Sequence, residues 1–93
     1  MILTFSDKNT EKIWNLVQVK SIPISIQKIG LRKMTILNGS RDVNDLRIPP
    51  SNHLEKLKND REGQYSIRIN DQWRICFRWE NGNAFDVEIV DYH

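Results

Sequence analysis

Four side chains in the C-terminal half of this chain could together cleave a phosphodiester bond. Arg68 and Arg74 carry guanidinium groups, which bind phosphate oxygens through paired hydrogen bonds. Tyr92 and His93 stand near them in the predicted sheet, and an imidazole exchanges protons close to neutral pH. Two arginines beside a proton-transferring histidine form a set that could act on a phosphate ester without a bound metal.

A second group of cations lies in the segment that precedes Arg68. Its members are Lys56, Lys58 and Arg61, and a loop beside the sheet could bring them to the same anion. The alternative is an ordinary solvated segment, in which the neighbouring acidic residues pair with some of these cations. The sequence leaves both interpretations open.

Other kinds of site find little support in the composition. Cys76 is the only cysteine, so an internal disulfide and a CxxC metal site are excluded. His53 and His93 are isolated and no acidic cluster suits magnesium, so we expect no metal and no cofactor, and we interpret His53 as a loop residue. No apolar run approaches the roughly 20 residues of a membrane span, and residues 1–5 do not resemble a signal peptide. We therefore expect a cytoplasmic protein without a membrane partner.

Three stretches of alternating apolar and polar residues must position the candidate side chains. They cover residues 65–69, 73–79 and 85–89, and the alternation is typical of half-buried antiparallel strands joined by turns. The apolar face of this sheet should pack on helices. The face that carries the arginines should remain open.

The N-terminal half is predicted to supply those helices. Residues 2–5 are predicted to form a short first strand, and a helix capped by Ser6 or Asp7 should run to about Val19. A second helix should begin at Pro23 and end at the Asn-Gly pair before Ser40.

Residues 40–63 are expected to be a long connection with one short helical turn near residues 42–46. A chain of 93 residues has room for one domain, spanning 1–93. The predicted fold class is α+β: a short N-terminal strand and a two-helix hairpin packed on an antiparallel sheet of about four strands.

The predicted register of the first hairpin brings two like charges together. A three-residue turn at 70–72 sets Arg68 directly opposite Arg74, which is unfavourable by up to about 1 kcal/mol. A bound phosphate would relieve this repulsion, and the alternative is that the two long side chains splay apart into solvent. Val90 should be the partner of Arg74 on the last strand, and no acidic residue is in an obvious position to neutralise this arginine.

The second hairpin is predicted to have a three-residue loop at 81–83. That register keeps Phe77, Phe85 and Val87 on the apolar face. A two-residue Asn-Gly turn would instead set Phe77 opposite Asp86 and bring a charge onto that face. The apolar pattern therefore argues against the usual Asn-Gly hairpin.

Arg78 shares the open face with Arg74 but has a structural explanation. The predicted register sets Arg78 opposite Asp86 and Cys76 opposite Glu88, and a cross-strand ion pair would remove Arg78 from the site. Arg74 is then the arginine that remains available.

Two motifs in the second half of the chain are quite specific. They are the W-R-I-x-F segment from Trp73 to Phe77 and the Asp91-Tyr92-His93 segment, within a longer similar stretch that starts at Pro49. Together with the order strand, two helices, three antiparallel strands, this stretch closely resembles the HigB group of the RelE/ParE toxin superfamily.

The resemblance implies a growth-inhibiting toxin of a toxin–antitoxin pair that enters the ribosomal A site and cuts translated mRNA. The implied partners are the ribosome with its mRNA and a HigA-like antitoxin with a helix-turn-helix domain. The complex would repress its own operon, so this chain would meet DNA only through the antitoxin.

The resemblance also implies site residues. The candidate catalytic positions are Arg74, His93, Tyr92, Lys58 and Asp91. The candidate RNA- and phosphate-binding positions are Arg68, Lys56, Arg61 and Asn70. Some relatives carry an arginine where Asn70 stands, and Arg68 is the candidate substitute two residues earlier on the same face.

Two rival functions stay open. One is a ParE-like poison of gyrase on the same fold, against which the paired arginines and the Tyr92-His93 pair argue. The other is a non-catalytic module that binds RNA or protein, which would keep the basic patch but tolerate the loss of His93.

Overall fold

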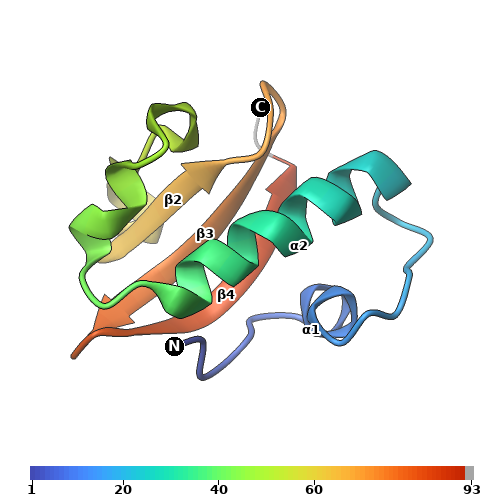
Figure 1. Ribbon diagram of the computed structural model, residues 1–93, viewed down its shortest axis with the longest axis horizontal. Helices are drawn as coiled ribbons and strands as arrows, with labels where there is room; N and C mark the ends of the chain where they lie inside the picture. Colours follow the sequence, from blue (N-terminus) through green and yellow to red (C-terminus); the bar gives the residue numbers. More distant parts are fainter. Residues whose placement is uncertain (92–93) are drawn as a thin grey trace.

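The computed structural model describes residues 1–91, in which two α-helices lie against one face of a four-stranded antiparallel sheet (Figure 1). The helices are α1 (Lys8–Trp14) and α2 (Ile24–Gly39). The strands are β1 (Glu55–Lys56), β2 (Gln64–Arg68), β3 (Trp73–Glu80) and β4 (Asn83–Asp91), in the spatial order β1-β2-β3-β4. Short 3₁₀ turns flank β1: η1 (Val43–Arg47), η2 (Pro50–Asn52) and η3 (Asn59–Arg61). The predicted α+β class, with two helices packed on a four-stranded antiparallel sheet, is confirmed.

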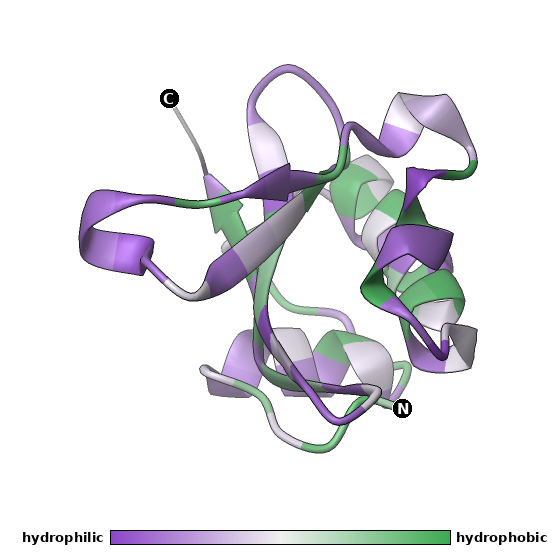
Figure 2. Ribbon diagram, turned by 90° about the vertical axis from the view of Figure 1, so that its left-hand side faces the viewer, coloured by the Kyte–Doolittle hydropathy of each residue, from purple (hydrophilic) through white to green (hydrophobic). Residues whose placement is uncertain are grey.

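The core lies between α2 and the sheet. Met34 and Leu37 of α2 are fully buried, as are Phe77 and Ile75 of β3. Gly30 brings the helix close to the strands, since a Cβ at this position would lie 3.0 Å from the Cδ1 of Ile89. The loop that holds η3 projects from the other side of the sheet (Figure 2), and we call that side the open face.

The predicted N-terminal strand is wrong. Residues 1–6 run parallel to β4 but form only two isolated bridges, Ile2 with Ala84 and Phe5 with Val87. Backbone hydrogen bonds link this segment to Ala84 and to Val87. Because β4 bulges between these two residues, no continuous ladder of hydrogen bonds forms. The fourth strand is instead β1, which the sequence had placed inside a long connection.

The first helix is also shorter than predicted, ending at Trp14 rather than near Val19. The buried side chain of Gln27 exchanges hydrogen bonds with the backbone N–H and carbonyl of Val19, at 3.1 and 2.8 Å, which draws the chain away from the helix axis. Leu16 takes a φ of 67°, a left-handed conformation that ends helices. The second helix and the turn at residues 42–46 are confirmed, the latter with a capping box at Asp42.

The first hairpin has the predicted register. Arg68 lies opposite Arg74, and Arg74 lies opposite Val90 on β4. The two arginines therefore share the open face, as the sequence pattern required.

The second hairpin corrects the prediction. A two-residue Asn81-Gly82 turn forms, with positive φ at both residues, and a register shift follows between Cys76 and Arg78. The bulge at Asp86, whose φ is 54°, absorbs the one-residue offset, so the favoured turn and the apolar face are both kept. Ala84 becomes the buried residue near the turn, and Phe85 moves to the side of Arg78.

Within residues 1–91, no helix has the length and apolar character needed to cross a membrane.

Candidate functional site

Arg74 is the centre of the open face between β2 and β3. Its Nε donates a hydrogen bond to the Oγ of buried Ser66 at 2.8 Å, and its Nη2 donates to the backbone carbonyl of His53 at 2.7 Å. The side chain is only 12% exposed. A guanidinium has five N–H groups, and residues 1–91 accept hydrogen bonds from two of them, so further donors remain for an anion.

Both oxygens that hold Arg74 are neutral. They fix the direction of the guanidinium without cancelling its charge, which preserves its attraction for a phosphate. One carboxylate stands further away, because Glu55 Oε1 lies 4.0 Å from Nη2 and is half exposed. The expectation that no acidic residue neighbours Arg74 is therefore wrong: pairing of β1 with β2 sets Glu55 opposite Ser66, on the open face.

A buried polar network supports the His53 carbonyl. The side-chain amide of Asn52 donates to the backbone carbonyls of Leu46 and Ile48, at 3.1 and 3.4 Å. Its oxygen accepts a hydrogen bond from the ammonium of Lys33 on α2, and burial lowers the pKa of Lys33. The helix layer thus fixes the loop whose backbone holds Arg74.

His53 itself lies in a loop, as expected, with a φ of 43°. Its backbone carbonyl enters the site. The sequence carried no local signal for this role, because a backbone carbonyl is available at every residue.

Arg68 lies beside Arg74 but turns toward the adjacent loop, where it forms an ion pair with Asp71. Asp71 is almost fully exposed, so water competes for this pair and its contribution to stability is small. The ion pair therefore holds the Arg68 guanidinium only weakly.

The three cations that precede β2 are not brought together. Arg61 reaches the open face, where its Nη1 lies 3.3 Å from Glu88 Oε1 and 3.2 Å from Gln64 Oε1. Lys56 pairs with Tyr65, which gives it the strand parity opposite to Arg74. Lys58 is exposed immediately before η3.

Asn70 shapes the turn between β2 and β3. Its side-chain oxygen accepts hydrogen bonds from the backbone N–H groups of Gln72 and Trp73, both at 2.8 Å. This is an Asx-type turn, in which the side chain replaces a backbone acceptor. The side-chain oxygen of Asn70 is therefore already used, and Arg68 is the better candidate for a phosphate contact.

Asp91 is the last candidate that the structure describes. It lies opposite Trp73, and its carboxylate accepts hydrogen bonds from the Gln72 amide at 3.2 Å. Tyr92 and His93 fall outside the described residues.

The other end of β3 carries an arginine of different character. Arg78 Nε donates to Asp86 Oδ2 at 2.7 Å, and its Nη1 lies 3.3 Å from Glu80 Oε1. The hydrogen bond to Asp86 raises the pKa of Arg78. The guanidinium also stands 5.3 Å from the centroid of the Phe85 ring, within the range of a cation–π contact. The predicted ion pair is confirmed, although the bulge rather than a direct pairing creates it.

Cys76 lies on β3 between the two arginines and is fully buried. Burial raises the pKa of its thiol. A protonated buried thiol is a poor nucleophile, so Cys76 is a structural residue.

Residues 1–91 contain no group of three or more His, Cys, Asp and Glu side chains that could hold a metal ion.

Comparisons with known proteins identify the family and the fold. The family model described as the RelE-like toxin of the type II toxin–antitoxin system HigB matches residues 3–93. Toxin HigB-1 of Vibrio cholerae serotype O1 is 39% identical over 88 residues, covering 94% of this chain and 93% of the relative. Endoribonuclease HigB of Proteus vulgaris is 48% identical over 40 residues, 43% of this chain and 44% of the relative.

A solved structure shares the fold. The YoeB–YefM complex from Staphylococcus aureus contains a chain that superposes with a TM-score of 0.64 and 22% identity, covering 100% of this chain and 95% of that one.

Proposed function

The chain belongs to the RelE-like HigB toxins of type II toxin–antitoxin systems, and from that premise we propose that it arrests growth by cutting translated mRNA in the ribosomal A site. One observation carries the proposal: Arg74 is held by two neutral oxygens on an open sheet face, with N–H groups to spare. The name of the Proteus vulgaris relative, an endoribonuclease, supports the same activity.

In the proposed reaction the 2′-hydroxyl of one nucleotide attacks the neighbouring phosphorus. The phosphorus–oxygen bond to the next nucleotide breaks, which leaves a 2′,3′-cyclic phosphate and a free 5′-hydroxyl. Negative charge grows on the non-bridging oxygens during this step. Arg74 and Arg68 stabilise that charge, and a positioned donor of this kind is worth about 10²- to 10³-fold in rate.

Two proton transfers complete the reaction. The attacking hydroxyl loses a proton and the leaving oxygen gains one, and we assign these transfers to His93 together with exposed Lys58 or Asp91. Tyr92 is proposed to stack on a base and orient the chain. Because the nucleophile belongs to the RNA and the charge is met by guanidinium groups, the reaction needs no bound metal.

The proposed partners follow from the family. We propose a HigA-like helix-turn-helix antitoxin in the cytoplasm, which also brings the complex to DNA, and the ribosome as the scaffold that presents mRNA. The structural neighbour with the same fold was solved as a complex of YoeB with YefM, which supports an antitoxin partner.

The test is to map mRNA ends after induction and in a purified translation system with and without ribosomes. We expect cleavage within translated codons when ribosomes are present, and loss of cleavage in Arg74→Ala and in a chain without His93. Full toxicity in both variants would contradict the site assignment. DNA breaks in place of mRNA ends would favour the gyrase-poison alternative.

A further inference from the structure

Two buried apolar side chains among residues 1–91 lie outside the main core. Leu57 and Cys76 are 6% and 0% exposed, yet neither belongs to the cluster between α2 and the sheet. Both are on the open face by strand register, because Cys76 and Glu55 each lie opposite Ser66, and Leu57 follows Glu55 by two residues. The helices cover the other face of the sheet, so a different segment must cover these two side chains.

That segment is the connection between β1 and β2, residues 57–63, which contains η3 and which we call the strap. It projects on the open-face side of the sheet (Figure 2). Nη1 of Arg61 in the strap lies 3.2 Å from Gln64 Oε1 on β2 and 3.3 Å from Glu88 Oε1 on β4. Because β3 lies between β2 and β4, and Cys76 lies opposite Glu88, the Arg61 guanidinium crosses β3 at Cys76.

The charges around Cys76 agree with this arrangement. Burial raises the pKa of its thiol, while Arg61 lowers this pKa, Glu88 raises it and Arg74 lowers it. The three charged groups therefore lie close to one small side chain. The strap meets the sheet beside the arginine that is proposed to bind the phosphate.

One turn of 3₁₀ helix connects Arg61 to Lys58. The N–H of Arg61 donates to the backbone carbonyl of Lys58 at 3.4 Å, and Lys58 directly follows buried Leu57. Asn59 and Gly63 have positive φ values of 59° and 88°, so the chain turns sharply on both sides of Arg61. A contact that fixes Arg61 therefore also restrains the backbone of Lys58.

The pair of Arg61 with Glu88 is suited to a local role. The two side chains are 31% and 29% exposed, so water competes with the pair and its contribution to global stability is small. Its loss should leave the sheet folded and free only the strap.

We infer that Glu88 is a positioning residue, which acts through Arg61 to hold the strap against the open face and to restrain Lys58. Arg61 then has the role of a tie, in place of the direct phosphate contact that the sequence suggested. The inference rests on the proposed function only in taking Lys58 to transfer a proton during cleavage.

The first test measures how fast iodoacetamide labels Cys76 in the folded toxin, by mass spectrometry. Arg61→Ala and Glu88→Gln should each speed labelling about threefold or more, because loss of the pair raises the fraction of molecules with an open strap. A change of charge without opening would give a different pattern. It would slow labelling in Arg61→Ala, by raising the pKa of the thiol, and speed labelling in Glu88→Gln.

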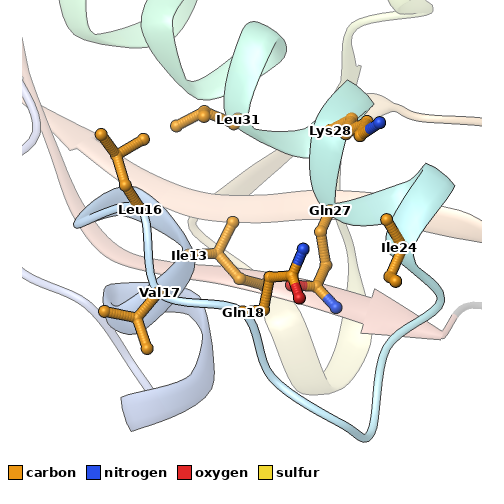
Figure 3. Close-up of a pocket in the computed structure, with 8 residues that line it drawn as sticks. All are labelled: Ile13, Leu16, Val17, Gln18, Ile24, Gln27, Lys28 and Leu31. Atoms are coloured by element: carbon orange, nitrogen blue, oxygen red, sulfur yellow. The ribbon is translucent and has the colours of Figure 1, made fainter.

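Two control variants should leave labelling within about twofold of the unaltered toxin. Glu80→Gln is the matched control, because Glu80 Oε1 also lies 3.3 Å from an arginine nitrogen, Nη1 of Arg78, but this pair holds no loop. Leu16→Asn is a remote control at a hollow on the helical side of the molecule (Figure 3). Leu16 is 78% exposed, and asparagine tolerates its left-handed backbone.

Cleavage of ribosome-bound mRNA gives the second readout. Glu88→Gln should lower kcat about tenfold and change KM less than about threefold, because the proton transfer loses its fixed geometry while the phosphate site at Arg74 is intact. The charge-swapped variant Arg61→Glu/Glu88→Arg re-forms the pair. It should therefore recover slow labelling and most of kcat.

Two results would overturn the inference. The first is slow labelling in both Arg61→Ala and Glu88→Gln. The second is slow labelling with low cleavage in the charge-swapped variant, since Arg61 would then act on RNA directly. If the unaltered toxin does not cleave mRNA, the proposed function fails, but the labelling rates still decide whether Glu88 holds the strap.

Discussion

Two arginines on one face of β3, four residues apart, have opposite surroundings. Arg78 lies between two carboxylates and beside an aromatic ring. Arg74 is held by a hydroxyl and a backbone carbonyl, with one carboxylate at 4.0 Å. The same residue type thus lies against carboxylates at one end of the strand and mainly against neutral oxygens at the other, and this contrast is the basis for proposing Arg74 rather than Arg78 as the phosphate-binding arginine.

The largest expected effect contrasts the two arginines directly. Arg74→Ala should reduce mRNA cleavage about 10²- to 10³-fold, because it removes a donor to the developing phosphate charge. Arg78→Ala should change the rate by less than about twofold, since its charge is already paired. Rate constants for cleavage of a defined ribosome-bound mRNA would measure both effects. Equal losses in the two variants would show that the different surroundings of the arginines do not give them different roles.

A second prediction concerns the Lys33–Asn52 network, which supports the loop whose backbone holds Arg74. Asn52→Leu leaves the buried Lys33 ammonium and two carbonyls without a partner, so the free energy of unfolding should fall by about 1 to 3 kcal/mol. Cleavage should fall about tenfold, because the His53 carbonyl loses its fixed position.

The double variant Lys33→Met/Asn52→Leu separates stability from positioning. Removing the buried ammonium should recover part of the free energy of unfolding, because an unpaired charge is no longer buried. Cleavage should remain low. Recovery of full cleavage in the double variant would show that the loop does not position Arg74.

A smaller effect is expected from removing the one carboxylate that lies near Arg74. Glu55→Gln removes the nearby carboxylate, so affinity for RNA should rise a few-fold, with a steeper dependence on salt. Asp86→Asn at Arg78 is the matched control, and it should alter RNA affinity less because Glu80 still accompanies Arg78. Fluorescence anisotropy with a short labelled RNA would measure both affinities. A larger change in Asp86→Asn than in Glu55→Gln would indicate that Arg78, rather than Arg74, contacts the RNA.

The smallest effect is expected at Cys76, between the two arginines. Burial raises the pKa of its thiol, so the thiol stays protonated at pH 8 and should react with iodoacetamide far more slowly than a free cysteine. Labelling should become fast on unfolding in urea, as mass spectrometry would show. Cys76→Ala should leave cleavage nearly unchanged, and a large loss would give the thiol a role that its burial argues against.

The register of the first hairpin was predictable because the apolar–polar alternation alone determined it. Alternation on both strands and a short polar turn left a single register that kept the apolar residues together, and Arg68 therefore had to lie opposite Arg74. The ion pair between Arg78 and Asp86 was also predicted, although its register was wrong.

The second hairpin was not predictable in detail because two local signals conflicted. The Asn81-Gly82 pair favours a two-residue turn, and the apolar pattern favours a three-residue loop. Both signals are satisfied because Asp86 adopts a positive φ and forms a bulge. The N-terminal segment contacts this bulge: the hydroxyl of Thr4 accepts a hydrogen bond from the Asp86 N–H at 2.8 Å.

By itself the sequence determined the α+β class, the central strands and the two arginines on one face, because periodicity and turn residues act over short distances. Only the tertiary structure decided what surrounds Arg74. The His53 carbonyl and the Glu55 carboxylate reach it from segments distant in the chain, and the Lys33–Asn52 network supports the loop that supplies the carbonyl. Their positions depend on how a loop without a repeating pattern packs between a helix and a sheet edge, and no local signal encodes that packing.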